Sequence, residues 1–204
     1  MKLWHCADAR SFRVLWTMEE LGLPYELELL PFPPRFAQPE YLKVNPLGTI
    51  PYFEDGATQM TESAAITQYL VTRHGPTPLA VDAADPAYGA WLNWLHFGEA
   101  TLTFPQTLVL RYTILEPPER RQPGIAADYA RWFTKRTLAV EAALAHSDWL
   151  CAGRFTAADI SVGYALLLAN QLGLLAGLAP VIHDYWSRLQ QRGGFVRAKA
   201  AQQR

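Results

Sequence analysis

The sequence predicts a small α/β unit followed by an all-helical unit. Three observations support this fold class. Strand-period and helix-period patterns alternate through the first 80 residues, and only helix-period patterns occur after about residue 85. Between them lies RHGPTPLAVDAADPA, a stretch rich in Pro, Ala and Asp that is typical of a linker. We therefore expect one domain over residues 1–78 and an all-helical domain over residues 86–204.

The first unit is expected to have the element order β-α-β-α-β-β-α. Apolar residues recur at helical spacing before Gly22, which stands where a helix end is expected. Asp55-Gly56 is typical of a hairpin turn. The expected strands are 2–7, 25–29, 50–54 and 58–60, the expected helices are 11–21, 39–44 and 61–72, and 31–39 is expected to be a proline-rich loop.

The second unit is expected to contain four helices, the third of which has a distinct start. Thr156 can cap that helix while Asp159, three residues later, reaches back to the Thr156 N–H, which is a capping box. The first helix should bend near Pro105, because proline cannot continue the helical ladder. The four expected helices are 85–111, 125–145, 156–172 and 180–191.

Composition and charge exclude several classes of function. A net charge of −1 and a pI near 6.5 argue against a nucleic-acid-binding protein. The start MKLWHCADAR lacks the apolar run of a signal peptide, and no long uncharged apolar stretch predicts a membrane span. No histidine or cysteine spacing typical of a metal site appears, nor any nucleotide-binding glycine motif. We expect a cytoplasmic protein without metal or nucleotide cofactors.

The stretch VNPLGTIPYFEDG places Pro51 directly before an expected strand. Proline cannot donate to a sheet ladder, so it belongs at the first residue of a strand, at an edge or at a bulge. One interpretation is that Pro51 only ends a loop. The other is a cis bond between Ile50 and Pro51, which turns the chain sharply and leaves neighbouring main-chain groups available to a ligand.

Three motifs carry a resemblance to a known family. NPLGTIP at 45–51, ESAAI at 62–66 and FTAADI at 155–160 occur in the order seen in cytosolic glutathione transferases, and the chain resembles that family over nearly its whole length. The resemblance implies a thioredoxin-like N-terminal domain, an all-α C-terminal domain and glutathione as co-substrate. It also implies a homodimer and a role in detoxification.

The resemblance implies which residues bind glutathione. Pro51 would be cis, and the main chain of Ile50 would pair with the cysteinyl backbone of glutathione as an added strand. Glu62 and Ser63 fall at the start of an expected helix, where unpaired N–H groups favour a carboxylate. Ser63 would hold the γ-glutamyl carboxylate, and Glu62 would balance the adjacent ammonium group.

The sequence offers several candidates for the group that activates the glutathione thiol. In HCADARSFRVLW, Asp8 and Ala9 stand where relatives carry a serine, and Arg10 stands where others carry a cysteine. Asp8 has the wrong charge to stabilise a thiolate. The remaining candidates are the Ser11 hydroxyl, the Arg10 charge, the Cys6 thiol and the main-chain N–H groups of residues 10 and 11.

We expect Ser11 and Arg10 to be the catalytic residues, because a helix start and a nearby cation both lower the pKa of a thiol. The function that the resemblance implies is conjugation of the glutathione thiolate to a hydrophobic electrophile. Two alternatives remain open at this point. One is a glutathione-dependent thiol reductase or lyase that uses Cys6, and the other is a non-enzymatic protein that binds glutathione or another ligand.

Overall fold

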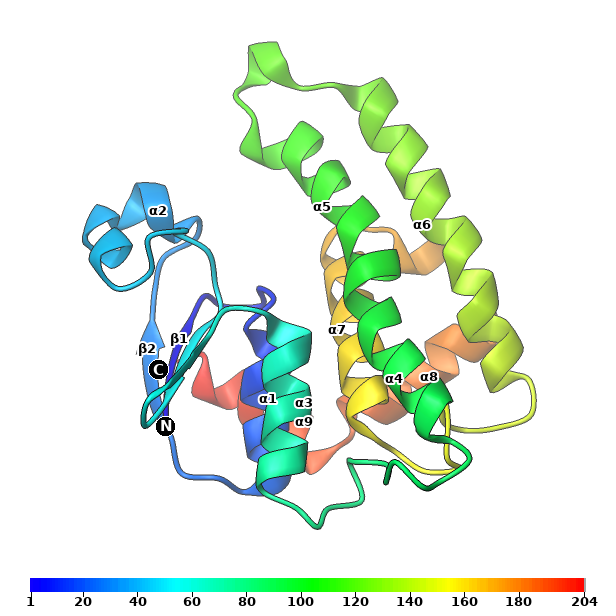
Figure 1. Cartoon of the computed structure of the whole chain (residues 1–204). Coiled ribbons are helices and arrows are strands. Elements are labelled where there is room, and N and C mark those ends of the chain that lie inside the picture. Colours follow the sequence, from blue (N-terminus) through cyan, green and yellow to red (C-terminus); the bar gives the residue numbers. More distant parts are fainter. Residues whose placement is uncertain (204) are drawn as a thin grey trace. The chain divides into compact units, whose positions relative to one another are not determined.

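A computed structural model gives the fold of the chain and describes residues 1–203 (Figure 1). The chain forms two compact units. The first consists of Met1–Ala80 together with the chain from Gln190 onward, and the second is Val81–Leu189. The C-terminal segment thus belongs to the same unit as the N-terminal strands, although nearly 110 residues separate the two segments in the sequence.

A four-stranded mixed sheet forms the centre of the first unit. Its strand order is β2-β1-β3-β4, in which β1 pairs parallel with β2 and antiparallel with β3, and β3 pairs antiparallel with β4. The strands are β1 (Lys2–His5), β2 (Glu26–Leu29), β3 (Tyr52–Asp55) and β4 (Thr58–Met60). This order confirms the thioredoxin-like fold, including the hairpin predicted around Asp55-Gly56.

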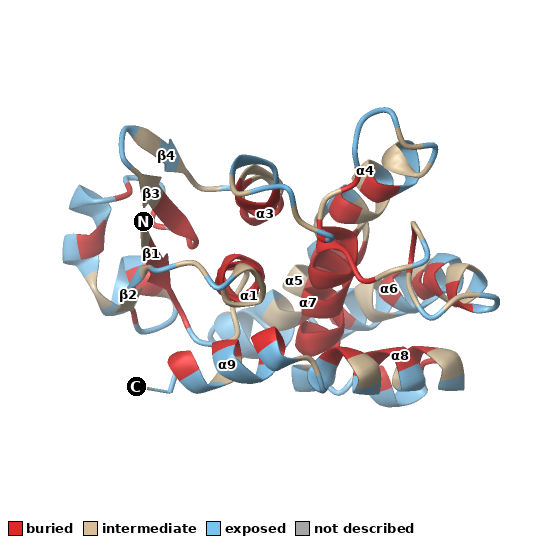
Figure 2. Cartoon of the chain, turned by 90° about the horizontal axis from the view of Figure 1, so that it is seen from below, coloured by how far each residue is buried: buried red, intermediate tan, exposed pale blue. Residues whose placement is uncertain are grey.

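Two helices, α1 (Phe12–Leu21) and α3 (Ser63–Arg73), cover one face of this sheet, whereas α2 (Pro34–Ala37) lies on its other side (Figures 1 and 2). The short helix predicted over 39–44 forms a 3-10 helix, η1 (Pro39–Lys43). The prediction of a loop over 31–39 was wrong at α2, because Pro34 occupies the first helical position, where its missing N–H costs nothing.

The helix α1 follows the predicted pattern closely. Its residues Phe12, Leu15, Trp16 and Met18 are fully buried. Gly22 ends the helix in the left-handed conformation, with φ 64°, and its N–H donates to the Glu19 carbonyl oxygen. Glycine suits this position because it adopts a positive φ without steric cost.

The helix α9 (Gly193–Ala201) was not predicted and packs beside α1. The Phe195 ring meets the rings of Phe12 and Trp16 edge to face, with centroid distances of 5.4 and 5.0 Å. Arg192 binds both carboxylate oxygens of Glu20 at 2.8 Å. Aromatic packing and a bidentate ion pair therefore hold α9 against α1 in the first unit.

The second unit is helical throughout its described elements. In it α7 is buried along nearly its entire length (Figure 2). Its α-helices are α4 (Tyr88–His96), α5 (Phe104–Leu110), α6 (Pro123–Leu144), α7 (Ala157–Gln171) and α8 (Pro180–Gln190), with π-helical segments η2 (Phe97–Thr103) and η3 (Arg111–Leu115) and 3-10 turns η4 (Pro118–Arg120) and η5 (Leu175–Gly177).

The long helix predicted over 85–111 changes type at η2, immediately before Pro105. Close packing on α7 accompanies this change. A Cβ atom on Gly98 would lie 2.4 Å from Ser161 Oγ, and Ser161 Oγ donates to the Leu95 carbonyl oxygen at 2.6 Å. A side chain from α7 thus binds a helical carbonyl where the regular ladder is interrupted.

The capping box predicted at the start of α7 is confirmed. The Ala158 N–H donates to Thr156 Oγ1 at 3.3 Å, and the Thr156 N–H donates to Asp159 Oδ2 at 2.8 Å. Asp159 is fully buried and also accepts hydrogen bonds from the Leu150 N–H and the Tyr185 hydroxyl. The cap therefore also ties the start of α7 to the preceding loop and to α8.

In the part of the chain that the structure describes, no helix combines the length and the apolar character that a bilayer crossing demands.

Candidate functional site

The NPLGT segment forms a tight loop ahead of β3. Asn45 is buried, its side-chain amide donates to the Thr49 carbonyl oxygen at 2.8 Å, and its Oδ1 accepts from the Leu47 N–H at 3.1 Å. Gly48 has φ 61°, and a Cβ atom there would lie 2.7 Å from the Cβ of Arg35. Asn45 and Gly48 thus fix the shape of the chain that leads to Ile50.

The bond between Ile50 and Pro51 is cis, as predicted. Continuing the β1–β3 register would place Cys6 opposite Ile50, but the ladder ends two residue pairs earlier, at Trp4 and Tyr52. The Cys6 N–H donates to Ser11 Oγ and its carbonyl oxygen accepts from the Ala9 N–H. Within residues 1–203, the N–H and C=O of Ile50 therefore form no hydrogen bond.

The Ile50 side chain has a separate, structural role. It is 8% exposed and belongs to a hydrophobic cluster with Trp4, Cys6, Leu30, Tyr41 and Tyr52. This cluster holds the backbone of Ile50 in place while leaving its two main-chain polar groups unpaired. Ile50 is thus anchored by its side chain and has main-chain groups that a ligand strand can use.

The predicted pair Glu62 and Ser63 lies at the start of α3. Glu62 is the N-cap residue, with an extended backbone at φ −91°, and its side chain is exposed. Its side chain does not cap the helix. Ser63 is the first helical residue and is 3% exposed. The N–H groups of the first turn and the positive end of the helix dipole therefore lie beside the Ser63 hydroxyl.

Arg13 also belongs to this site, and the sequence analysis missed it. Arg13 is a fully buried side chain of α1, and its Nη1 donates to Ser63 Oγ at 3.0 Å. Because Ser63 Oγ accepts from Arg13, its own proton remains available for an anion. The available signal was a charged residue inside the apolar run Phe12–Leu15. The start of α3 is consequently electropositive through both the helix and Arg13.

Of the two predicted catalytic residues, Ser11 faces inward. The whole residue is buried, its hydroxyl oxygen accepts from the Cys6 N–H at 3.3 Å and the hydroxyl lies 3.5 Å from the Cys6 carbonyl oxygen. Ser11 precedes α1 but does not cap it with its side chain. Its hydroxyl ties the start of α1 to the end of β1.

The neighbouring residues Ala9 and Arg10 are partly exposed. Ala9 packs against the hydrophobic cluster around Ile50, where its methyl group needs no hydrogen-bond partner. Arg10 places a guanidinium group two residues before α1 begins. Between the buried Ser11 and the exposed Ala7, this pair presents one apolar and one cationic side chain at the β1–α1 turn.

Cys6 is unsuited to nucleophilic chemistry. It is fully buried, and burial raises the pKa of its thiol to about 12. The thiol lies 3.6 Å from the Pro31 carbonyl oxygen. Since the thiolate is the reactive form of cysteine, Cys6 at neutral pH acts as a packed side chain of the cluster.

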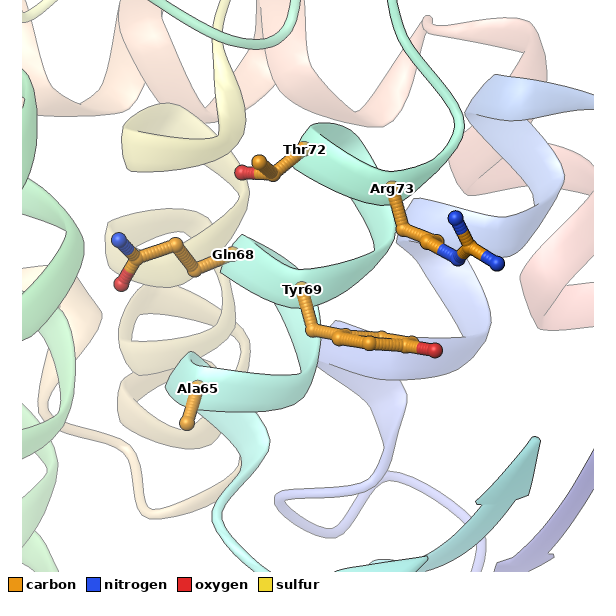
Figure 3. Close-up of a pocket in the computed structure, with 5 residues that line it drawn as sticks. All are labelled: Ala65, Gln68, Tyr69, Thr72 and Arg73. Atoms are coloured by element: carbon orange, nitrogen blue, oxygen red, sulfur yellow. The ribbon is translucent and has the colours of Figure 1, made fainter. Parts of the chain in front are cut away.

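A hollow of about 550 Å³ lies along later turns of α3 and is lined by Ala65, Gln68, Tyr69, Thr72 and Arg73 (Figure 3). The Tyr69 hydroxyl donates to Asp55 Oδ2 at 2.9 Å, so this side chain is held by the sheet. Among residues 1–203, no group of three or more His, Cys, Asp or Glu side chains is arranged to hold a metal ion.

Comparison with known proteins identifies the class of this fold. The structure of a ternary complex of BphK, a bacterial GST, superposes with a TM-score of 0.87 at 22% identity over 100% of both chains. Ure2p in complex with glutathione superposes with a TM-score of 0.84 at 20% identity, over 97% of this chain and 96% of that one. The class is thus a thioredoxin-like domain joined to a helical domain.

Sequence comparison then identifies the family. A family model described as glutathione S-transferase, N-terminal domain, matches residues 6–78. Glutathione S-transferase hmp2 of Hypomyces subiculosus is 30% identical over 98% of both chains. The chain belongs to the cytosolic glutathione S-transferase family.

Proposed function

We propose that this protein binds glutathione in its first unit and joins the thiolate sulfur of the intact glutathione to a hydrophobic electrophile. The observation that carries the proposal is the pair of unpaired main-chain groups, N–H and C=O, of Ile50 beside the cis Pro51. The cysteinyl residue of glutathione has a complementary N–H and C=O. It would add to the edge as a short antiparallel strand.

The start of α3 would hold the γ-glutamyl end of glutathione. The Ser63 hydroxyl and the first-turn N–H groups would donate to its carboxylate, and Arg13 would offset the added negative charge. The exposed carboxylate of Glu62 would pair with the α-ammonium group. This arrangement satisfies both charges of the amino-acid end within one helix start.

The sulfur would lie at the β1–α1 turn. There the partly exposed Arg10 would stabilise the thiolate by charge, and Ser11 would support the turn through its bond to Cys6. The thiol loses its proton to water or buffer, and the thiolate forms a carbon–sulfur bond as the leaving group departs with its electron pair.

For the second substrate, α4 and η2 offer a hollow of about 350 Å³ lined by Leu92, Asn93, His96, Phe97, Ala100 and Thr101. Three of these six residues, Leu92, Phe97 and Ala100, are apolar and would contact the apolar part of an electrophile. We further propose a cytoplasmic homodimer that acts in detoxification, as the family resemblance implies. A solution mass equal to one 22.9 kDa chain would contradict the dimer.

The proposed function is tested by turnover of an activated aryl halide with glutathione, followed by product analysis. We expect a thioether product and a rate that depends on the glutathione concentration. Arg10→Gln should slow turnover near neutral pH, and the loss should shrink at higher pH, where the thiol ionises unaided. Tight glutathione binding without any thioether product would instead identify a non-enzymatic binding protein.

A further inference from the structure

The β1–α1 turn has an unusual backbone that its own residues only partly explain. Asp8 has φ 54°, in the left-handed region that residues other than glycine rarely adopt. Within the turn, the Ala9 N–H donates to the Cys6 carbonyl oxygen at 3.1 Å. Asp8 itself is bound from outside the turn, by side chains of the C-terminal segment.

Gln202, the residue after α9, binds this turn through both ends of its amide. Its Oε1 accepts from the Asp8 main-chain N–H at 3.1 Å and from His5 Nε2 at 3.0 Å, which assigns the His5 proton to Nε2. Its Nε2 donates to Asp8 Oδ1 at 2.6 Å. Gln202 is 8% exposed, so these bonds are shielded from water.

Lys199, on α9, neutralises Asp8. Its Nζ lies 2.7 Å from Asp8 Oδ1 and 2.9 Å from Oδ2, with both side chains less than one-third exposed. A carboxylate beside a bound thiolate would raise the pKa of that thiol by repulsion. Lys199 balances the negative charge of Asp8, which lies two residues before Arg10 in the turn.

The two contacts depend on a helix that is itself firmly held. Phe195 packs on α1, and Arg192 pairs with Glu20, at the opposite end of α1 from the turn. The position of α9 along α1 is therefore fixed independently of Asp8. A change in Lys199 or Gln202 can alter the turn without releasing the helix.

We infer that the C-terminal helix sets the shape and charge of the sulfur-binding turn, with Gln202 and Lys199 as positioning residues that act through Asp8. This inference rests on the proposed function. Gln202 holds the turn so that its main chain and Arg10 face the sulfur. Lys199 keeps the Asp8 charge from opposing the thiolate.

The test compares Lys199→Met and Gln202→Leu with a control, Arg197→Met. Arg197 lies on the same helix but binds Glu19 near the far end of α1, so the control loses an α9 ion pair without touching the turn. Thiolate absorbance of bound glutathione is titrated against pH in each variant. Lys199→Met should lower the thiolate fraction at neutral pH roughly tenfold, the smaller end of what a nearby charge causes.

Adding Asp8→Asn to Lys199→Met should restore the thiolate fraction, because the unbalanced charge is removed. Gln202→Leu should lower the thiolate fraction and also speed amide exchange at Asp8 and Ala9 in the ligand-free protein. Titrations and exchange rates equal to those of Arg197→Met in both variants would overturn the inference.

The two proposals fail separately. If the wild-type protein does not bind glutathione, the proposed function is wrong, and amide exchange alone decides whether Gln202 holds the turn. If Gln202→Leu does not fold, the partly exposed Lys199→Met and its Asp8→Asn rescue decide the inference by titration.

Discussion

Arg13 adds a buried positive charge to the start of α3. It is fully buried, and a buried charge is costly unless it is paired. Its contact with Ser63 places a cation beside the helix start where a carboxylate is expected. The sequence predicted Glu62 and Ser63 through their motif. The apolar run around Arg13 indicates that this charge is buried, but not that its partner is Ser63, because a contact across 50 residues leaves no local pattern.

Ser63→Ala should weaken glutathione binding by roughly tenfold or more, the effect of losing a hydrogen bond to a charged group. Calorimetric titration measures this affinity. Thr67→Val is the matched control. It removes a buried hydroxyl from α3 at a position one turn after Ser63. Equal affinities for Ser63→Ala and wild type would refute the assignment.

Ser11→Ala should lower the free energy of unfolding by about 1–3 kcal/mol, because the buried Cys6 N–H loses its acceptor. Urea denaturation measures this change. Unchanged stability together with slowed conjugation would mean that the Ser11 hydroxyl acts on the sulfur directly, contrary to the role proposed for it here.

His5 makes the stability of the first unit depend on pH. Burial lowers its pKa to about 4, although the hydrogen bond to Gln202 and the charge of Asp8 act in the opposite direction. The unfolded chain has the ordinary pKa of 6.5 and takes up a proton first as the pH falls. The stabilisation is therefore complete above pH 6.5 and is lost towards pH 4, by about 3 kcal/mol in total.

Unfolding curves recorded between pH 7 and pH 4 check this dependence. His5→Gln removes the titrating ring, so its stability should fall less steeply over the same range. Parallel curves for the two proteins would show that His5 does not titrate as described.

At the scale of elements, the sequence predicted the helices and helix ends that depend on neighbouring residues. The pattern of α1, the glycine at its end and the α7 capping box were all read correctly because each depends on residues within one or two turns. The helix α9 escaped prediction because it is short and begins with two glycines, which are poor helix formers. Its stability comes from Phe195 and Arg192, whose partners lie more than 170 residues away.

Thr156→Ala should lower the free energy of unfolding by about 0.5–2 kcal/mol, the usual cost of losing an N-cap. Asp159→Ala should cost more, because it strips acceptors from the buried Leu150 N–H and Tyr185 hydroxyl as well. Chemical denaturation measures both changes. A smaller effect for Asp159→Ala than for Thr156→Ala would contradict this description of the cap.

At the scale of the whole molecule, the sequence predicted an α/β unit followed by a helical unit, and the comparisons confirm that fold. What it could not predict is the return of the chain to the first unit after Leu189. That return brings Lys199 and Gln202 to the turn at Asp8. The candidate site therefore combines residues from both ends of the chain, a property of tertiary packing rather than of any motif.

The central claim is that glutathione binds as an added strand at Ile50 with its γ-glutamyl end on α3. A crystal structure of the glutathione complex tests it most directly. We predict that the cysteinyl N–H and C=O pair with the main chain of Ile50 and that the γ-glutamyl carboxylate accepts from Ser63. Glutathione bound away from both residues, with the Ile50 main chain still unpaired, would contradict the account.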